Sequence, residues 1–443
     1  MPVSPARVVA FDILLRVERQ SSYASELLHS SACENLSPVD HSLATELVMG
    51  VIRWRLWLDA QIAPASSQPL SKLDLEVLIA LRLAVYQLRF LTRIPEHAIL
   101  NESVELVKRA RKRSAAPFTN AVLRKIARTT PDTPQNASTA NLSRDLSHPE
   151  WLVQRWIQRF GAEITRRICL HGQSTPATTL RLRTPEAEAL IVDAGISLAP
   201  GALLSFARRA TSGDVTKTDP FRNGQIIIQD EASQLVASLI GHDLQGNILD
   251  CCAAPGGKTL VIADRNPQAM VTAIDLHPHR AHLLRKLARV ANQERMQIVA
   301  ADARHMPTSS AFTRVLADVP CSGTGTLARN PEIKWRLQPR DLSDLHTRQW
   351  AILRSAMNQV APGARLLYST CSLEREENED VVEQALAGNP SFELLDCAAE
   401  LQKLTAAGEF IWTGAPMTEG RYLRTIPGLH PCDGFFAAIL LRK

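Results

Sequence analysis

Two kinds of hydrophobic pattern divide the chain. From the N-terminus to about residue 128, apolar residues recur at intervals of three and four, as in ARVVAFDILLRV, LATELVMGVIRWRLWLDAQI, LEVLIALRLAVYQLRFL and AVLRKIA. This spacing places the apolar side chains on one face of a helix. Prolines and short polar stretches separate these runs. The pattern therefore predicts an all-helical domain over residues 1–128.

A different pattern begins near residue 226. Short apolar runs alternate with helix-length segments: QIIIQ, NILDC, MVTAID, QIVAA, RVLADV, ARLLYST and FFAAILL. Strands that alternate with helices predict βαβ units and a parallel sheet covered on both faces. Ligands of such sheets bind at the carboxyl ends of the strands. We therefore expect an α/β domain over residues 226–443, with its site at that edge.

The segment between these two regions is less regular. Residues 129–143, TTPDTPQNASTANLS, show no periodicity and have the composition of a linker. In residues 144–225, the stretch HPEWLVQRWIQRFG predicts a helix that ends at Gly161. The runs TTLRLRT and LLSFA are β-like, with GISLAPGA between them. We expect a small α/β middle module over residues 144–225.

Composition is that of an ordinary globular protein, with 45% hydrophobic and 21% charged residues in 443. No apolar run approaches the ~18 residues that span a bilayer. The N-terminal stretch VVAFDILL contains Asp12 and continues into RVERQ, which is unlike a secretory signal. These features predict a cytoplasmic protein that is not bound to a membrane.

The net charge of +5 is unevenly distributed. Residues 101–128 contain eight basic side chains: Lys108, Arg109, Arg111, Lys112, Arg113, Arg124, Lys125 and Arg128. A second basic stretch covers residues 280–295. A solvated helix face and a binding surface for a polyanion such as RNA both fit this pattern.

The cysteines do not form a disulfide or zinc pattern. Eight are present, at positions 33, 169, 251, 252, 321, 371, 397 and 432. No pair has C-x-x-C spacing, and no histidines cluster near them at zinc-ligand intervals. We therefore expect reduced thiols and no metal site.

A glycine-rich loop, CAAPGGKT, follows the predicted strand NILDC. Such a turn lets the backbone approach a ligand closely. A phosphate-binding P-loop would need glycine at Cys252, and a dinucleotide fingerprint needs more than Gly256 and Gly257. A nucleoside site such as that for S-adenosylmethionine remains. Asp275 and Asp302 follow the next two strands, where they could bind ribose and adenine or simply cap helices.

Two thiols lie at the ends of later strands: Cys321 in ADVPCSGTG and Cys371 in LLYSTCSLEREENED. Most cysteines at apolar strand ends are inert. Beside S-adenosylmethionine, however, a thiolate could add to carbon 6 of a pyrimidine and make carbon 5 nucleophilic. Asp318 could contact the N3 edge of the base or form a turn, and Lys258 could lower the pKa of a thiol.

At these residues the chain resembles a known family, the Sun/Fmu-type bacterial 16S ribosomal RNA cytosine-5 methyltransferases. LDCCAAPGGKT, ADVPCSGTGTLARNPEIKW, LLYSTCSLEREENEDVV and DGFFAAILLRK are similar to its motifs in order and spacing. ILNESVELVKRA and FTNAVLRKI resemble the NusB-like RNA-binding fold. The resemblance implies a NusB-like N-terminal domain and a Rossmann-like S-adenosylmethionine-dependent methyltransferase domain.

The same resemblance assigns roles to the site residues. It implies that Cys371 attacks the cytosine and that Cys321 assists release of the methylated base. It also implies S-adenosylmethionine contacts from the following residues: Cys252, Ala253, Ala254, Pro255, Gly256, Gly257, Lys258, Asp275, Arg280, Asp302 and Asp318.

Two other functions are compatible with parts of the pattern. One is a 5-methylcytosine transferase that acts on transfer RNA or another ribosomal site. The other is a non-catalytic RNA-binding assembly factor, which would not need the cofactor loop or both thiols. We expect the ribosomal substrate, in a free or early-assembly state, and a monomeric enzyme.

Overall fold

The computed structural model describes residues 3–20, 22–129, 141–306 and 312–443. The predicted linker therefore lies mostly outside the described residues. The chain forms two compact units, of which the first contains residues 1–175 and 327–337 and the second contains the rest. This grouping by contacts does not test the predicted division into three domains, which stays a prediction. Among the described residues, no helix combines the length and apolar composition that a membrane span requires.

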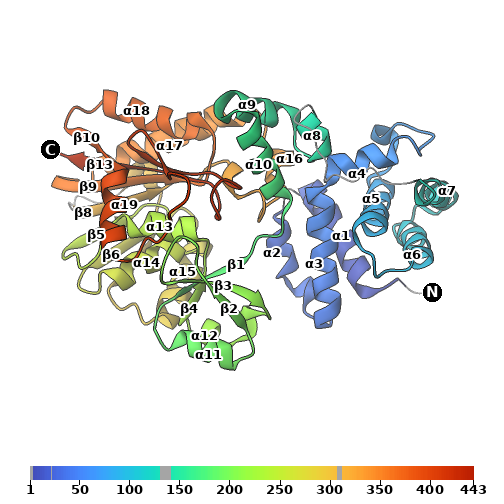
Figure 1. The fold of residues 1–443 in the computed structure, drawn as a ribbon, viewed down its shortest axis with the longest axis horizontal. Coiled ribbons are helices and arrows are strands. Elements are labelled where there is room, and N and C mark those ends of the chain that lie inside the picture. Colours follow the sequence, from blue (N-terminus) through green and yellow to red (C-terminus); the bar gives the residue numbers. More distant parts are fainter. Residues whose placement is uncertain (1–2, 21, 130–140, 307–311) are drawn as a thin grey trace. The chain divides into compact units, whose positions relative to one another are not determined.

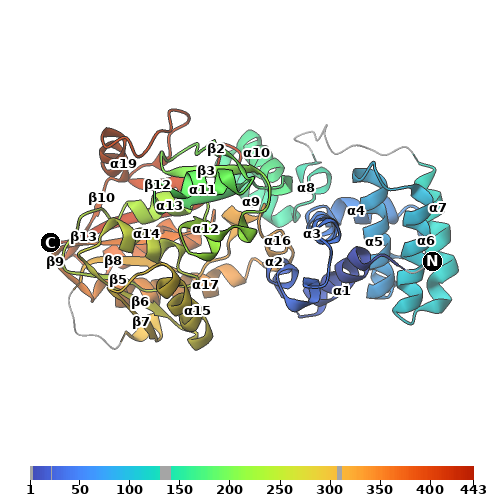
Figure 2. The ribbon, with the colours of Figure 1, turned by 90° about the horizontal axis from the view of Figure 1, so that it is seen from below.

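The first unit is helical, as the periodicity predicts. Its helices are α1 (Pro5–Gln20), α2 (Ala24–Leu28), α3 (Pro38–Arg53), α4 (Arg55–Ile62), α5 (Leu75–Phe90), α6 (Glu96–Arg109), α7 (Ala116–Ala127), α8 (Leu142–Asp145), α9 (Glu150–Phe160), α10 (Ala162–Gln173) and α16 (Ile333–Arg336). Helices α5, α6 and α7 lie side by side (Figure 2).

Helix α5 is the centre of the first unit. Its residues from Ile79 to Gln87 are all buried, which is the burial expected of a helix that is apolar on every side. The one charged side chain among them, Arg82, is held by two 2.7 Å hydrogen bonds to Asp59 of α4. Such bidentate pairs are the arrangement in which a buried guanidinium is tolerated.

Residues 327–337, called the excursion below, lie between two stretches of the second unit in the sequence but pack into the first unit. The Trp335 indole donates a 2.7 Å hydrogen bond to the Ile52 carbonyl, and the Ala24 amide donates to Glu332. Lys334 is fully buried, and its ammonium donates to the Arg53 carbonyl at 3.0 Å. Burial lowers the pKa of Lys334 well below its usual range. The excursion is therefore a component of the helical core.

The second unit begins with a four-stranded antiparallel sheet in the order β2-β3-β1-β4. Its strands are β1 (Thr178–Leu182), β2 (Ser197–Pro200), β3 (Ala207–Ser212) and β4 (Ile226–Ile228), and the helices α11 (Ala187–Asp193) and α12 (Asp219–Arg222) accompany them. The prediction of a strand over LLSFA was wrong for most of the run, which precedes β3, because Leu203 and Leu204 pack into the core. GISLAPGA, for which no element was predicted, contains β2.

The larger sheet has nine strands, in the order β11-β12-β13-β9-β8-β5-β6-β7, with β10 beside β13. The strands are β5 (Asn247–Asp250), β6 (Met270–Asp275), β7 (Met296–Ala300), β8 (Phe312–Asp318), β9 (Val360–Thr370), β10 (Phe392–Leu395), β11 (Thr418–Glu419), β12 (Tyr422–Thr425) and β13 (Phe435–Arg442). The predicted parallel strands β5 to β9 are confirmed.

Two apolar runs do not extend this parallel sheet. QIIIQ forms β4 and pairs antiparallel with β1 in the smaller sheet. FFAAILL forms β13 and pairs antiparallel with β9. A continuous apolar run indicates a strand that is buried on both faces. It does not indicate whether the neighbouring strand runs parallel or antiparallel, so the pattern alone could not distinguish these two strands from β5 to β9.

Helices cover both faces of the larger sheet (Figure 1). One face carries α13 (Glu231–Ser238), α14 (Gly257–Arg265), α15 (Pro278–Val290) and α19 (Cys397–Ala406). The other carries α17 (Asp341–Met357) and α18 (Glu379–Ala387). The two cores meet through alternate residues of the same strands, such as Leu316 and Leu367 on one face and Val315 and Leu366 on the other.

Candidate functional site

A cavity of about 590 Å³ opens at the carboxyl ends of the parallel strands. This is the edge at which ligands bind in open α/β sheets. Eight of the predicted site residues line it: Cys252, Ala254, Asp275, Arg280, Asp302, Asp318, Cys321 and Cys371. The structure therefore brings together residues that are separated by more than one hundred positions in the sequence.

The cofactor loop is anchored by a carboxylate that the sequence analysis did not single out. Asp250 ends β5 and is buried, with its Oδ2 atom accepting a 2.8 Å hydrogen bond from the Thr259 hydroxyl. Its Oδ1 atom accepts from the Cys252 amide at 3.3 Å. Burial raises the pKa of Asp250 to about 7. Asp250 occupies the same strand-end position that identified Asp275.

Gly256 turns the loop into α14. Its φ of 114° is a conformation that side chains disfavour, and an added Cβ would lie 2.5 Å from Leu284 Cδ1 and 2.9 Å from Leu287 Cδ2. Both the backbone conformation and the contact with α15 therefore require glycine. The predicted residues Ala253, Pro255, Gly256, Gly257 and Lys258 support this turn and do not themselves line the cavity.

Asp275 and Arg280 act on the same wall of the cavity. Asp275 Oδ1 accepts a 3.0 Å hydrogen bond from the His277 amide, which orients a carboxylate that is almost fully buried. The Arg280 guanidinium lies 3.7 Å from Asp275 Oδ2 and donates to the Ala254 carbonyl at 2.9 Å. Arg280 thus links the loop after β5 to the loop after β6.

Asp302 both caps a turn and faces the cavity. Its carboxylate accepts from the Arg304 amide at 2.9 Å and from the Arg304 guanidinium at 2.6 Å. The hydrogen bond from Arg304 holds the pKa of Asp302 below its usual range. Arg304 Nε also lies 3.0 Å from each oxygen, so three N–H groups of Arg304 occupy most of the about four acceptor positions and leave one for a ligand donor.

Asp318 ends β8 and is held from two sides. Its Oδ2 atom accepts a 2.8 Å hydrogen bond from the Lys258 ammonium, and its Oδ1 atom accepts one of 2.8 Å from the Ser369 hydroxyl. Burial lowers the pKa of Lys258, but the charge and hydrogen bond of Asp318 outweigh it, and Cys371 adds to the net increase. Lys258 therefore provides a positive charge beside the Asp318 carboxylate and the Cys371 thiol.

The two candidate thiols are in direct contact. The Sγ atoms of Cys321 and Cys371 are 3.2 Å apart, although 50 positions separate them in the chain. The hydrogen bond to Cys371 and burial raise the pKa of Cys321 well above its usual range. All eight cysteines are free, and Cys33, Cys169, Cys251, Cys397 and Cys432 are buried. Of the eight cysteines, Cys321 and Cys371 are the two whose sulfur atoms are in contact, and both line the cavity.

The backbone ties the two thiol loops to each other. The Gly325 amide donates a 2.9 Å hydrogen bond to the Cys371 carbonyl, and the Leu373 amide donates one of 2.9 Å to the Thr324 hydroxyl. A Cβ on Gly325 would lie 2.1 Å from the Gly434 carbonyl oxygen. The glycine after the Pro-Cys motif is therefore required for close backbone approach rather than for a nucleotide.

Other cavity residues escaped the sequence analysis. Arg348 lies in the middle of α17, where no local signal distinguishes it from a solvated helix residue. Arg304 lies in the turn that Asp302 caps, and Leu276 is an exposed apolar residue directly after Asp275. A search for apolar residues directly after strand-end carboxylates could have found Leu276.

Comparison with known proteins gives this site a family. A sequence profile described as 16S rRNA methyltransferase RsmB/F matches residues 238–441, and the NusB family profile matches residues 4–128. A Bacillus subtilis protein named probable ribosomal RNA small subunit methyltransferase B is 33% identical, with 100% of each chain covered. The chain belongs to the RsmB/F family of 16S rRNA methyltransferases. It is therefore an S-adenosylmethionine-dependent rRNA methyltransferase with a NusB-type N-terminal region.

Further relatives agree with this membership. Ribosomal RNA small subunit methyltransferase B of Pseudomonas putida is 32% identical, with 94% of each chain covered. The crystal structure of PH0851 has a TM-score of 0.80 at 22% identity and covers 99% of both chains. A methyltransferase homologue from Pyrococcus horikoshii has a TM-score of 0.58 at 23% identity and covers 70% of this chain and 100% of its own. These structures confirm the predicted fold class.

Proposed function

We propose that this RsmB/F methyltransferase methylates carbon 5 of one cytosine in 16S rRNA through a covalent bond to Cys371. The single observation that carries the proposal is the pair of thiols, 3.2 Å apart, at the cavity that Asp318 also lines. Methylation of an exocyclic nitrogen or a ribose oxygen needs no thiol. Addition to carbon 6 of a pyrimidine requires one thiolate, and release of the product gives the second a role.

The cavity fits S-adenosylmethionine on its own chemistry. Asp275 presents a buried, oriented carboxylate of the kind that accepts hydrogen bonds from ribose hydroxyls. Leu276 offers an exposed apolar surface beside it, and Asp302 retains acceptor capacity for an adenine amine. Cys252 and Ala254 border the cavity on the side of the glycine turn. When bound there, S-adenosylmethionine would supply an electrophilic methyl group, which carbon 5 takes up as the methyl–sulfonium bond breaks and S-adenosylhomocysteine leaves.

The first step belongs to Cys371. Its thiolate adds to carbon 6 of the cytosine, and the electron pair of the carbon 5–carbon 6 double bond becomes available at carbon 5. Asp318 accepts a hydrogen bond from the amine beside N3 and holds the ring in place. Lys258 and Ser369 fix this carboxylate through one hydrogen bond each.

The second step belongs to Cys321. Once Cys371 is bonded to carbon 6, its sulfur carries no charge and is a weaker hydrogen-bond acceptor, so the hydrogen bond and the charge of Cys371 no longer raise the pKa of Cys321 as they did, although burial still does. Cys321 then loses its proton to solvent and takes the proton from carbon 5. The bond from carbon 6 to Cys371 breaks, and its electron pair returns to that sulfur. The base is released methylated, with Cys371 again a thiolate.

The substrate form follows from access to the base. Carbon 6 of a stacked and paired cytosine is shielded, so the target must be unpaired or extruded. We propose free or early-assembly 16S rRNA as substrate and a monomeric enzyme. The basic residues of 101–128 would add phosphate contacts that weaken with salt.

The test combines product analysis with trapping of the covalent intermediate. The purified protein is incubated with unmodified 16S rRNA and S-adenosylmethionine, and the nucleosides are separated. We expect 5-methylcytidine from the wild type and none from Cys371→Ser. Cys321→Ser should accumulate an RNA–protein adduct on denaturing gels, whereas the double variant should form none.

A matched variant controls for loss of any thiol. Cys33→Ala removes a buried cysteine of the first unit and should retain wild-type product formation. Methylated nitrogen or ribose in place of 5-methylcytidine would refute the reaction. Unchanged 5-methylcytidine in rRNA from a deletion strain would refute the substrate.

A further inference from the structure

A buried carboxylate, Glu377, is hydrogen-bonded to the residues that follow the two thiols. Glu377 is fully buried and does not line the cavity. Its Oε1 atom accepts hydrogen bonds from the Ser322 amide at 2.7 Å and from the Gln349 side chain at 2.8 Å. Its Oε2 atom accepts from the hydroxyls of Ser322 and Ser372. The four donors occupy the whole acceptor capacity of the carboxylate.

These donors come from both thiol loops. Ser322 directly follows Cys321, and Ser372 directly follows Cys371. The two serine hydroxyls are also within 3.0 Å of each other. Gln349 of α17 donates a second hydrogen bond, of 2.9 Å, to the carbonyl of the residue before Cys321. The Glu377 carboxylate therefore accepts hydrogen bonds from both loops that carry the sulfur atoms.

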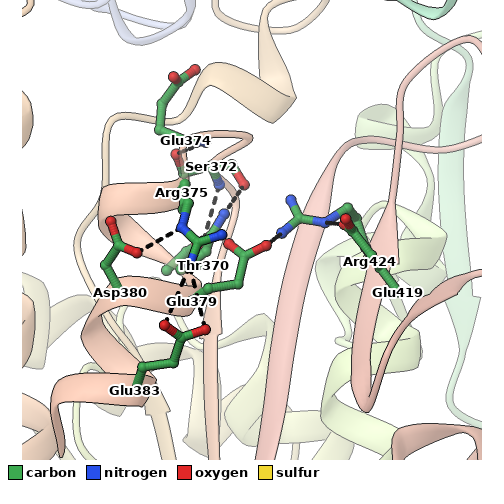
Figure 3. Close-up of polar contacts among 10 residues, drawn as sticks. Thr370, Ser372, Glu374, Arg375, Glu379, Asp380, Glu383, Glu419 and Arg424 are labelled. Carbon is green, nitrogen blue, oxygen red and sulfur yellow. Dashed lines mark hydrogen bonds and ion pairs between the residues drawn. The ribbon is translucent and has the colours of Figure 1, made fainter. Parts of the chain in front are cut away.

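The charge of Glu377 is not balanced by a cation. Neighbouring carboxylates pair with guanidinium groups (Figure 3): Asp380 and Glu383 with Arg375, and Glu379 and Glu419 with Arg424. No lysine or arginine forms an ion pair with Glu377 in the part of the chain that the structure describes. Only neutral donors stabilise this carboxylate. Burying a carboxylate without a cation costs desolvation free energy that an apolar side chain of the same size would not cost, so packing alone does not explain Glu377.

We propose that Glu377 is a positioning residue for methyl transfer, which holds Cys321 and Cys371 at a fixed separation so that both act on one base. The proposal rests on the proposed function of the two thiols. Glu377 acts through Ser322 and Ser372 and does not itself touch the substrate.

The charge of Glu377 has a second effect. Besides the larger contributions of Cys371 and burial, it helps to raise the pKa of Cys321. Among the described residues, Cys371, Glu377 and Tyr368 interact electrostatically with Cys321, and the charged side chains of Asp318 and Arg348 line the same cavity. Glu377 therefore helps to keep Cys321 protonated until the covalent bond has formed.

The test is Glu377→Gln in the full-length protein, followed in a single turnover with 16S rRNA. Glutamine keeps the size and the Oε1 acceptor. It replaces the Oε2 acceptor with an NH2 group, which cannot accept the hydrogen bonds from the Ser322 and Ser372 hydroxyls. Loss of charged hydrogen bonds of this kind predicts that adduct formation and adduct decay each slow by about 10-fold or more. The KM for S-adenosylmethionine should be unchanged. The pH dependence of adduct decay should move to lower pH, because an anion next to Cys321 is gone.

Glu383→Gln is the matched control, since it removes the same charge from an exposed position on α18. It should keep wild-type rates and pH dependence. Wild-type rates in Glu377→Gln, or slow rates with an unshifted pH profile, would overturn the proposal. Such a result differs from failure of the proposed function, in which Cys321→Ser yields no adduct and the wild type yields no 5-methylcytidine.

Discussion

Replacing Gly256 by alanine adds one methyl group at the turn of the cofactor loop. The residue has φ 114°, and the new Cβ would lie 2.5 Å from Leu284 Cδ1 and 2.9 Å from Leu287 Cδ2. Both leucines belong to α15, and Leu284 is fully buried. The substitution therefore combines backbone strain with overpacking against α15, which is itself packed on the sheet through Leu284.

The two costs can be estimated separately. A side chain at this φ costs about 1–3 kcal/mol. Forcing a methyl group into a packed core costs about 1–3 kcal/mol more. Gly408 also has a positive φ, 70°, but an added Cβ meets nothing within 4 Å. Gly408→Ala should therefore cost only the backbone part, about 1–3 kcal/mol, whereas Gly256→Ala should cost about 2–6 kcal/mol.

The assay is urea unfolding of both variants and the wild type, with S-adenosylmethionine affinity measured by calorimetry. We expect Gly256→Ala to lower the free energy of unfolding more than Gly408→Ala does. It should also weaken S-adenosylmethionine binding by about 10-fold or more, because a shift of the loop by a fraction of an ångström disturbs its contacts. Equal destabilisation by the two variants, with intact binding in both, would refute this account of the turn.

Two further predictions concern the site. Because the pKa of Asp250 is raised to about 7, the folded state holds a proton that the unfolded state releases near pH 4, so stability should fall as the pH rises between these values. Urea titrations across this range should show the fall in the wild type and a smaller one in Asp250→Asn; equal slopes would contradict it. Because the Sγ atoms of Cys321 and Cys371 are 3.2 Å apart, a disulfide-forming oxidant such as diamide should cross-link them and abolish activity until dithiothreitol is added. Mass spectrometry should find this cross-link, and oxidised enzyme with both thiols free and full activity would contradict the prediction.

The sequence predicted the fold where one period dominated. The helices of residues 1–128 and the strands β5 to β9 followed directly from periods of 3.6 and from short apolar runs. The run LATELVMGVIRWRLWLDAQI shows no break, yet α3 ends and α4 begins around Trp54, which stacks on Phe90 at 5.2 Å. That break depends on a partner in another helix, so local pattern could not reveal it.

The site was predicted to the extent that its residues lie at strand ends. Asp275, Asp318, Cys321 and Cys371 share that position, and the sheet brings them together because parallel strands end at one edge. Glu377 is different. It lies among several acidic residues in EREENED, and only the three-dimensional structure shows that it is turned inward while its neighbours meet arginines.

The excursion of residues 327–337 has a consequence for biosynthesis. The Trp335 indole and the Lys334 ammonium complete hydrogen bonds to the carbonyls of Ile52 and Arg53, so the helical core includes a segment made late in translation. N-terminal domains usually fold while the ribosome still makes the rest of the chain. Here, the first unit lacks part of its core until about three quarters of the protein has been synthesised, and this last part follows directly on the loop that carries Cys321.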